Sequence, residues 1–248
     1  MKKKYDFIAS IGEACICSES LRKSLLQIKS LPFDWLLSHD ILTNLDIVLN
    51  DFKDFLMEDY LEQSGENKPN DDNKRNWSYV YKNTKYQLNF IHDFKYGIEF
   101  EENYPKVVQK YQRRIDRFFK SIEDAKSILF VYIERPKTNE EQIADLNLLV
   151  DYQKKLEEKF PNKNIDILYF RMDWDRKYKD RIEKQLSEHV TFCQFYYSKY
   201  PKEVLKIVGN YFILMKALKD KASLNIPLWR KIINPLIVLK LTMKKYLK

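Results

Sequence analysis

One cysteine stands where a protein can activate a thiol. Cys15 follows a short apolar segment that ends at Gly12, and the pattern after it predicts a helix. Unpaired backbone N–H groups and the positive end of the helix dipole stabilise a thiolate there and lower its pKa. The same N–H groups could hold the oxyanion of an acyl-transfer intermediate. Cys15 is therefore a candidate nucleophile, with Gly12 and Glu13 as candidate substrate-binding residues. The alternative is a small buried hydrophobe, the usual state of a free cysteine.

A cysteine nucleophile needs a base within hydrogen-bond reach and a third group that orients the base. His92 is one of three histidines, and it follows an apolar run and precedes Asp93. We interpret it as the candidate base, against the alternative of a surface histidine or a satisfied core histidine. His39 and His189 stand in polar surroundings and are weaker candidates.

Charged residues in the second half of the chain could bind an anionic group of a substrate. Arg113 and Arg117 are four residues apart on one face of a predicted helix, and Arg114 lies beside them. Guanidinium groups in this arrangement can bind phosphate or carboxylate, although a solvated face balanced by nearby acids is the alternative. Glu134 and Arg135 end a predicted buried strand. Charged side chains at such a place either belong to a binding site or only keep the end of the strand solvated.

Strands and helices are predicted to alternate along the chain, because the spacing of its apolar residues alternates. Strands are expected at residues 5–11, 127–133, 165–170 and 190–196, with a short antiparallel pair at 79–81 and 86–90. Helices are expected at residues 14–28, 42–61, 104–122, 139–160 and 201–219, and an exposed loop at 64–76. The strand–helix–strand unit within residues 127–170 implies parallel pairing.

We therefore predict an α/β fold of three layers, with a mostly parallel sheet and helices on both faces. In open α/β sheets, ligands bind beyond the carboxyl ends of the strands. That rule directs attention to residues 12–15, 134–135 and 171–173.

Composition argues against several function classes. The 248 residues contain neither a G-x-G-x-x-G nor a G-x-x-x-x-G-K-[ST] motif, so no dinucleotide or P-loop nucleotide site is expected. Three scattered cysteines and the lack of a secretory signal favour free thiols in the cytoplasm. A Cys-x-Cys pair without further ligands is weak evidence for zinc, and we expect no metal and no cofactor.

The net charge of +8 is concentrated near the C-terminal end. Residues 219–248 contain seven Lys and one Arg against one Asp, which leaves the rest of the chain nearly neutral and argues against nucleic-acid binding. We predict a catalytic-type domain at residues 1–218 and a basic amphipathic helical extension at 219–248. Residues 224–248 could lie peripherally on the anionic inner face of a membrane, or pack on the body.

Several motifs follow one another in an order that resembles a known family. They are Ser10-Ile11-Gly12-Glu13-Ala14-Cys15, Leu21-Arg22, Pro32-Phe33-Asp34-Trp35, His92-Asp93-Phe94, Tyr104-Pro105 and Arg113-Arg114-Ile115-Asp116-Arg117-Phe118. In order and spacing they resemble an uncharacterised bacterial family catalogued as "putative papain-like cysteine peptidases". The resemblance implies Cys15 as nucleophile and His92 as base, with Asp93 or Glu134 as third member. It implies no substrate, and a papain-like fold pairs helices with an antiparallel sheet rather than a parallel one.

Three hypotheses about function follow. The first is a Cys-His hydrolase or acyltransferase acting on a small molecule, a glycan or a peptide. The second is a transferase that uses a phosphorylated or nucleotide-activated sugar in bacterial cell-surface polysaccharide synthesis, with the arginines binding phosphate and Cys15 structural. The third is a membrane-binding module that tolerates replacement of both Cys15 and His92. We rank the first ahead, because the resemblance names it.

Overall fold

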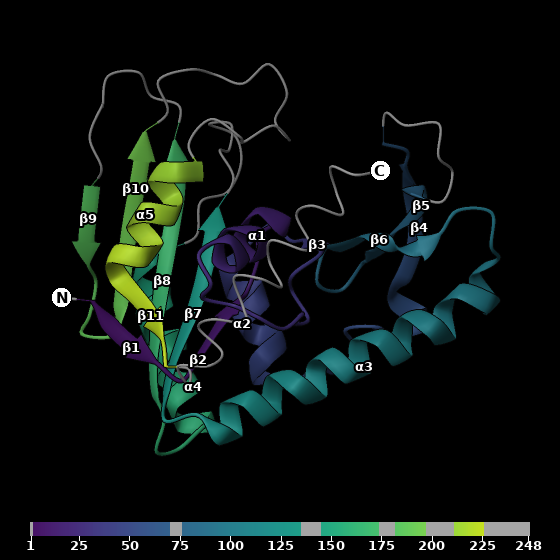
Figure 1. Ribbon diagram of the computed structural model, residues 1–248. Coiled ribbons are helices and arrows are strands. Elements are labelled where there is room, and N and C mark those ends of the chain that lie inside the picture. The colour runs from purple at the N-terminus through teal and green to yellow at the C-terminus, as the bar shows by residue number, and fades with distance from the viewer. Residues whose placement is uncertain (1, 70–75, 135–144, 174–181, 197–210, 226–248) are drawn as a thin grey trace.

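The computed structural model describes residues 2–69, 76–134, 145–173, 182–196 and 211–225 (Figure 1). The helices are α1 (Cys15–Lys23), α2 (Ile41–Leu49), the 3-10 helix η1 (Glu58–Tyr60), α3 (Phe100–Asp124), α4 (Leu146–Lys159) and α5 (Tyr211–Lys221). The strands are β1 (Lys3–Tyr5), β2 (Phe7–Ser10), β3 (Leu36–Leu37), β4 (Leu61–Asn67), β5 (Ser78–Asn83), β6 (Leu88–Lys95), β7 (Ser127–Glu134), β8 (Asn164–Asp173), β9 (Ile182–Gln185), β10 (Val190–Tyr196) and β11 (Ala222–Leu224).

The larger sheet has the strand order β2-β7-β8-β10-β9. Its first four strands run parallel, and β9 is antiparallel to β10. The internal strand β7 is a continuous apolar run because both of its faces are covered. Ile128 and Phe130 belong to a core that includes residues of α2, α3 and α4, whereas Leu129 and Val131 belong to a core with α1 and α5. Helices therefore cover both faces of this sheet.

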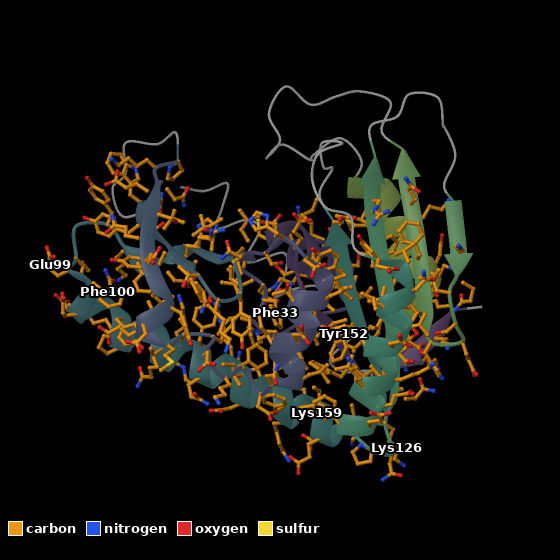
Figure 2. The ribbon with its side chains drawn as sticks, turned by 180° about the vertical axis from the view of Figure 1, so that it is seen from behind. Phe33, Glu99, Phe100, Lys126, Tyr152 and Lys159 are labelled. Carbon is orange, nitrogen blue, oxygen red and sulfur yellow. The ribbon has the colours of Figure 1, made fainter. Side chains whose placement is uncertain are left out.

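A smaller antiparallel sheet has the order β3-β6-β5-β4. The long helix α3 runs beside both sheets (Figure 1). Near its start Phe100 stacks on Phe94 of β6 at 5.9 Å between ring centroids, and near its end Phe118 stacks on Phe130 of β7 at 5.8 Å. Phe33 lies near the middle of the molecule in Figure 2, and its ring centroid is 5.3 Å from that of Phe52. One continuous aromatic core thus joins the two sheets.

The α/β class is confirmed, with a mixed larger sheet and an antiparallel smaller sheet. The predicted parallel pairing applies to the larger sheet, and the predicted antiparallel pair at 79–90 belongs to the smaller one. The helix predicted over 14–28 ends at Lys23, because Leu25 takes a left-handed backbone (φ 59°). The helix predicted over 42–61 ends at Leu49, after which Asp51, Phe52 and Asp54 have positive φ and Phe52 enters the core. The first residues of the loop predicted over 64–76 continue strand β4.

The C-terminal part of the described chain packs on the body. β11 pairs in parallel with β1, and Leu218 of α5 is fully buried. The predicted basic extension lies outside the described residues from 226 onward, as do residues 201–210 of the predicted fifth helix. Among the described residues, no helix is long and apolar enough to cross a membrane.

Candidate functional site

The chain leaves β2 along the edge of β7 and then turns at Gly12. The Ile11 N–H donates to the Val131 carbonyl at 3.0 Å, and the Glu13 N–H donates to the Ile133 carbonyl at 3.4 Å. Gly12 has φ +112° and precedes a cis peptide bond. A Cβ atom added at Gly12 would lie 2.5 Å from Asn44 Nδ2 and 2.8 Å from Ser38 Oγ. Only glycine fits this turn, because both the backbone angle and the space exclude a side chain.

We expect Gly12→Ala to lower the free energy of unfolding by about 2–3 kcal/mol, through backbone strain and overpacking. Urea denaturation measures the change. Gly65→Ala is the matched control, because a Cβ atom there meets nothing within 4 Å; it should stay within about 0.5 kcal/mol of the parent protein. Equal effects of the two substitutions would contradict the tight fit at Gly12.

Cys15 is the first residue of α1. The residue before it, Ala14, has an extended backbone and offers no side-chain cap to the helix. The side chain of Ala14 therefore does not occupy the first N–H groups of α1. An oxyanion site needs N–H groups that no side-chain cap occupies. Cys15 is half-buried, whereas Cys17 and Cys193 are fully buried. Burial raises the pKa of Cys17 to about 12, so Cys17 is a packed, neutral side chain.

The Gly12–Cys15 segment lies beside the end of β7. At this point the chain leaves the neighbouring strands β2 and β7 towards opposite faces of the sheet. The chain passes from β2 to α1 on one face, and from β7 towards α4 on the other. Such a point at the carboxyl edge is where α/β sheets bind ligands. Glu13 and Glu134 both lie at this edge, 1% and 2% exposed. The structure thus brings Glu13, Cys15 and Glu134 to one edge of the larger sheet.

Glu134 is held by a polar cluster on β8. The Arg171 Nε–H donates to Glu134 Oε2 at 2.7 Å, and the Tyr169 hydroxyl donates to the same oxygen. The hydroxyl of Tyr132 is buried without a hydrogen-bond partner in the described structure. Burial, together with the nearby Glu13 carboxylate, raises the pKa of Tyr132 well above its usual value. Neutral tyrosines and one arginine therefore surround the buried carboxylate.

His92 lies on β6 of the smaller sheet. Its Nδ1 atom is 3.2 Å from Asn67 Nδ2 on β4, with the hydrogen-bond roles set by the imidazole tautomer. The solvent-accessible area of His92 makes it an exposed residue. Enough protein nevertheless surrounds its ring for desolvation to lower the pKa of His92 below the usual value. The neighbouring Asp93 is buried and accepts hydrogen bonds from Lys110 and from the Tyr111 hydroxyl at 2.8 Å. Asp93 therefore binds α3 rather than the His92 ring.

A buried polar network connects α1 with the smaller sheet. Asp34 is fully buried and accepts from Arg22 Nη2 at 2.7 Å, from Gln27 Nε2 at 2.8 Å and from the Leu31 N–H at 2.9 Å. The Arg22 guanidinium also lies 5.6 Å from the centroid of the Trp35 ring. The next residue after Trp35 begins β3, which pairs with β6.

Three of the predicted arginines lie on α3 and differ in their contacts. Arg113 is exposed on α3, while Arg117 Nη1 donates to the Ser30 carbonyl at 2.6 Å. The Arg114 guanidinium lies 5.0 Å from the Tyr111 ring centroid, and its Nη1 atom is buried without a hydrogen-bond partner among the described residues. Arg135 lies outside the described residues. Arg117 thus has a structural contact, and no described contact joins these three arginines to Cys15.

Two polar side chains that the sequence did not predict lie near the candidate residues. Asn67 contacts His92 across the sheet, and Asn44 supports the Gly12 turn through its amide bonds to Ile11 and Ser38. Neither carries a local signal, since both contacts depend on strand pairing or on a helix from elsewhere in the chain. No group of three or more His, Cys, Asp or Glu side chains suited to a metal ion occurs within the described part of the chain.

The fold and this edge define an α/β protein with a half-buried thiol at the carboxyl end of a parallel strand. The chain belongs to the family described as "Putative papain-like cysteine peptidase (DUF1796)", whose model matches residues 6–174. The family prediction is therefore confirmed. A relative, "Uncharacterized protein R408" of Acanthamoeba polyphaga mimivirus, is 33% identical over 154 residues, which are 57% of this chain and 69% of the relative. No solved structure matches the chain.

Proposed function

We propose that this protein is a cysteine-dependent hydrolase or acyltransferase with Cys15 as its nucleophile. The observation that carries the proposal is the position of Cys15. It is the half-buried cysteine of the three, and it begins a helix at the carboxyl edge of the larger sheet. A thiolate at that position is stabilised by the helix dipole and by the first N–H groups. Membership of a family described as cysteine peptidases supports the same assignment.

In this mechanism the Cys15 sulfur attacks a carbonyl carbon, and the oxyanion that forms accepts hydrogen bonds from the N–H groups that begin α1. Two candidates for the orienting acid remain: Asp93, which Lys110 and Tyr111 of α3 hold, and Glu134, which Tyr169 and Arg171 of β8 hold at the same edge as Cys15. The family resemblance implies His92 as base, and its lowered pKa would keep the imidazole neutral and able to accept a proton near pH 7. Among the described residues, however, the hydrogen bond of His92 runs to Asn67 and none joins it to Cys15.

The alternative of a sugar transferase remains a prediction from the sequence. So do the small-molecule, glycan or peptide substrate, the peripheral contact with a membrane and the expected absence of nucleic-acid binding. The contact of Arg117 with Ser30 gives the transferase no particular support, because it assigns that guanidinium a structural partner.

Alkylation by iodoacetamide tests the proposal. Near pH 6 we expect Cys15 to react at least about tenfold faster than the thiol of N-acetylcysteine, because a stabilised thiolate persists where an ordinary thiol is protonated. Peptide mapping by mass spectrometry distinguishes Cys15 from Cys17 and Cys193, which are internal controls that should react slowly in the folded protein. A Cys15 rate no higher than that of N-acetylcysteine would sink the nucleophile assignment.

A further inference from the structure

Three residues at the ends of three strands lie side by side in the smaller sheet. Asn67, the last residue of β4, pairs with Ser78, the first residue of β5. Because these strands are antiparallel, the next residue along β4, Lys68, lies opposite Trp77. The Tyr96 N–H, just after β6, donates to the Trp77 carbonyl at 3.3 Å. Strand pairing therefore places the side chains of Lys68, Trp77 and Tyr96 at one end of the sheet.

The rings of Trp77 and Tyr96 form two walls around the ammonium group of Lys68. The two ring centroids are 5.4 Å apart, and the ring planes are inclined by 76°. Lys68 Nζ lies 5.2 Å from the centroid of the Trp77 ring and 5.0 Å from that of the Tyr96 ring. Both distances are within the ~6 Å at which a ring face attracts a cation. The Glu66 carboxylate forms an ion pair with the same ammonium group. Two ring faces and one carboxylate therefore converge on one cation.

The aromatic walls are held more firmly than the lysine between them. The Tyr79 ring centroid lies 5.1 Å from that of Tyr96, and the Tyr79 hydroxyl accepts from the Gly97 N–H at 3.4 Å in the turn before α3. Trp77, Tyr79 and Tyr96 are half-buried, whereas Lys68 is exposed. An exposed ion pair stabilises a side chain little, so the ammonium group can leave while the rings stay in place.

We propose that Trp77, Tyr96 and Glu66 form a binding site for a quaternary ammonium group, such as the trimethylammonium group of choline. In the structure the ammonium group of Lys68 stands in for that cation. A primary ammonium is strongly hydrated, whereas a trimethylammonium group presents methyl groups that contact both ring faces. The ligand therefore displaces Lys68. This site lies on the smaller sheet and does not depend on the chemistry proposed for Cys15.

Saturation-transfer NMR of the methyl protons of choline, titrated against the full chain, measures the binding. We expect Trp77→Leu to weaken choline binding at least about tenfold, because it removes one of the two ring faces. Lys68→Ala should strengthen choline binding about fivefold, because it removes the competing ammonium group. The uncharged analogue of choline, in which carbon replaces nitrogen, should bind the parent protein at least about tenfold more weakly than choline.

Tyr60→Leu is the matched control. Lys85 Nζ lies 5.5 Å from the ring centroids of both Tyr60 and Tyr86, so this substitution removes a cation–ring contact at the opposite end of the same strands. It should leave the affinity for choline unchanged. An equal loss in Tyr60→Leu and Trp77→Leu would overturn the inference, and so would equal binding of choline and its uncharged analogue.

Two variants at exposed positions keep the test decisive if Trp77→Leu does not fold. Glu66→Gln should weaken choline binding while Lys68→Ala strengthens it, because one removes the attracting charge and the other the competitor. The same affinity in both variants as in the parent protein would overturn the inference. Flotation with phosphatidylcholine vesicles distinguishes the source of the cation. Binding of the vesicles without binding of free choline would identify a lipid headgroup, and binding of free choline alone a small molecule.

Discussion

Replacing Cys15 by alanine is expected to lower the hydrolysis of p-nitrophenyl acetate on the order of 10³-fold or more, because removal of a covalent nucleophile leaves only binding and oxyanion stabilisation. The expected loss follows from the position of Cys15 at the first turn of α1, where the N–H groups favour a thiolate. The ester is an activated acyl donor, so the measurement needs no knowledge of the natural substrate. A burst of p-nitrophenolate equal to the enzyme concentration would report the acyl-enzyme in the parent protein.

Cys17→Ala is the matched control, since the same residue type is removed two positions later. Cys17 is fully buried and its thiol donates to the Val131 carbonyl at 3.2 Å. Its loss should reduce stability slightly through a small cavity while the hydrolysis rate stays close to that of the parent. Retention of more than half of the hydrolysis in Cys15→Ala would show that the thiol is not the nucleophile. The site would then have to act without covalent chemistry.

The second large effect is expected on stability, for Asp34→Ala. This carboxylate is fully buried, and Arg22, Gln27 and the Leu31 N–H donate to it. Burial raises the pKa of Asp34, and the Arg22 charge opposes that rise. Removing one partner of a buried ion pair leaves the other uncompensated, so we expect a loss of about 3–5 kcal/mol in the free energy of unfolding by urea.

Asp151→Ala serves as the control for Asp34→Ala. Asp151 is exposed on α4 and lies 3.8 Å from Lys154, so its replacement should change stability by no more than about 0.5 kcal/mol. Asp34→Asn should fall between the two, because the amide keeps the shape and part of the hydrogen bonding. If Asp34→Ala behaved like Asp151→Ala, the network that joins α1 to the smaller sheet would contribute little to folding.

The local spacing of apolar residues predicted many of the helices and strands, but not where all of them end. The apolar run of β7 was visible in the sequence, because a strand covered on both faces has to be apolar throughout. The bounds of β10, residues 190–196, were also predicted. The predicted C-terminal ends of α1 and α2 are wrong. Leu25 and Phe52 continue the helical spacing in sequence, yet both take a left-handed backbone. At Phe52 the packing of its ring against Phe33 and Phe118 accompanies the departure from the helix.

What the sequence determined by itself is the α/β class, the family and the placement of Cys15 at a strand end. Each depends on local patterns and on the order in which they follow one another along the chain. The tertiary structure decided the partners of those residues. Asn67 of β4 reaches His92 of β6 past the intervening strand β5, Asp93 accepts from Tyr111 of α3, and the Ser38 N–H donates to the Glu13 carbonyl. These contacts join residues 18 to 25 positions apart, and only folding makes them neighbours.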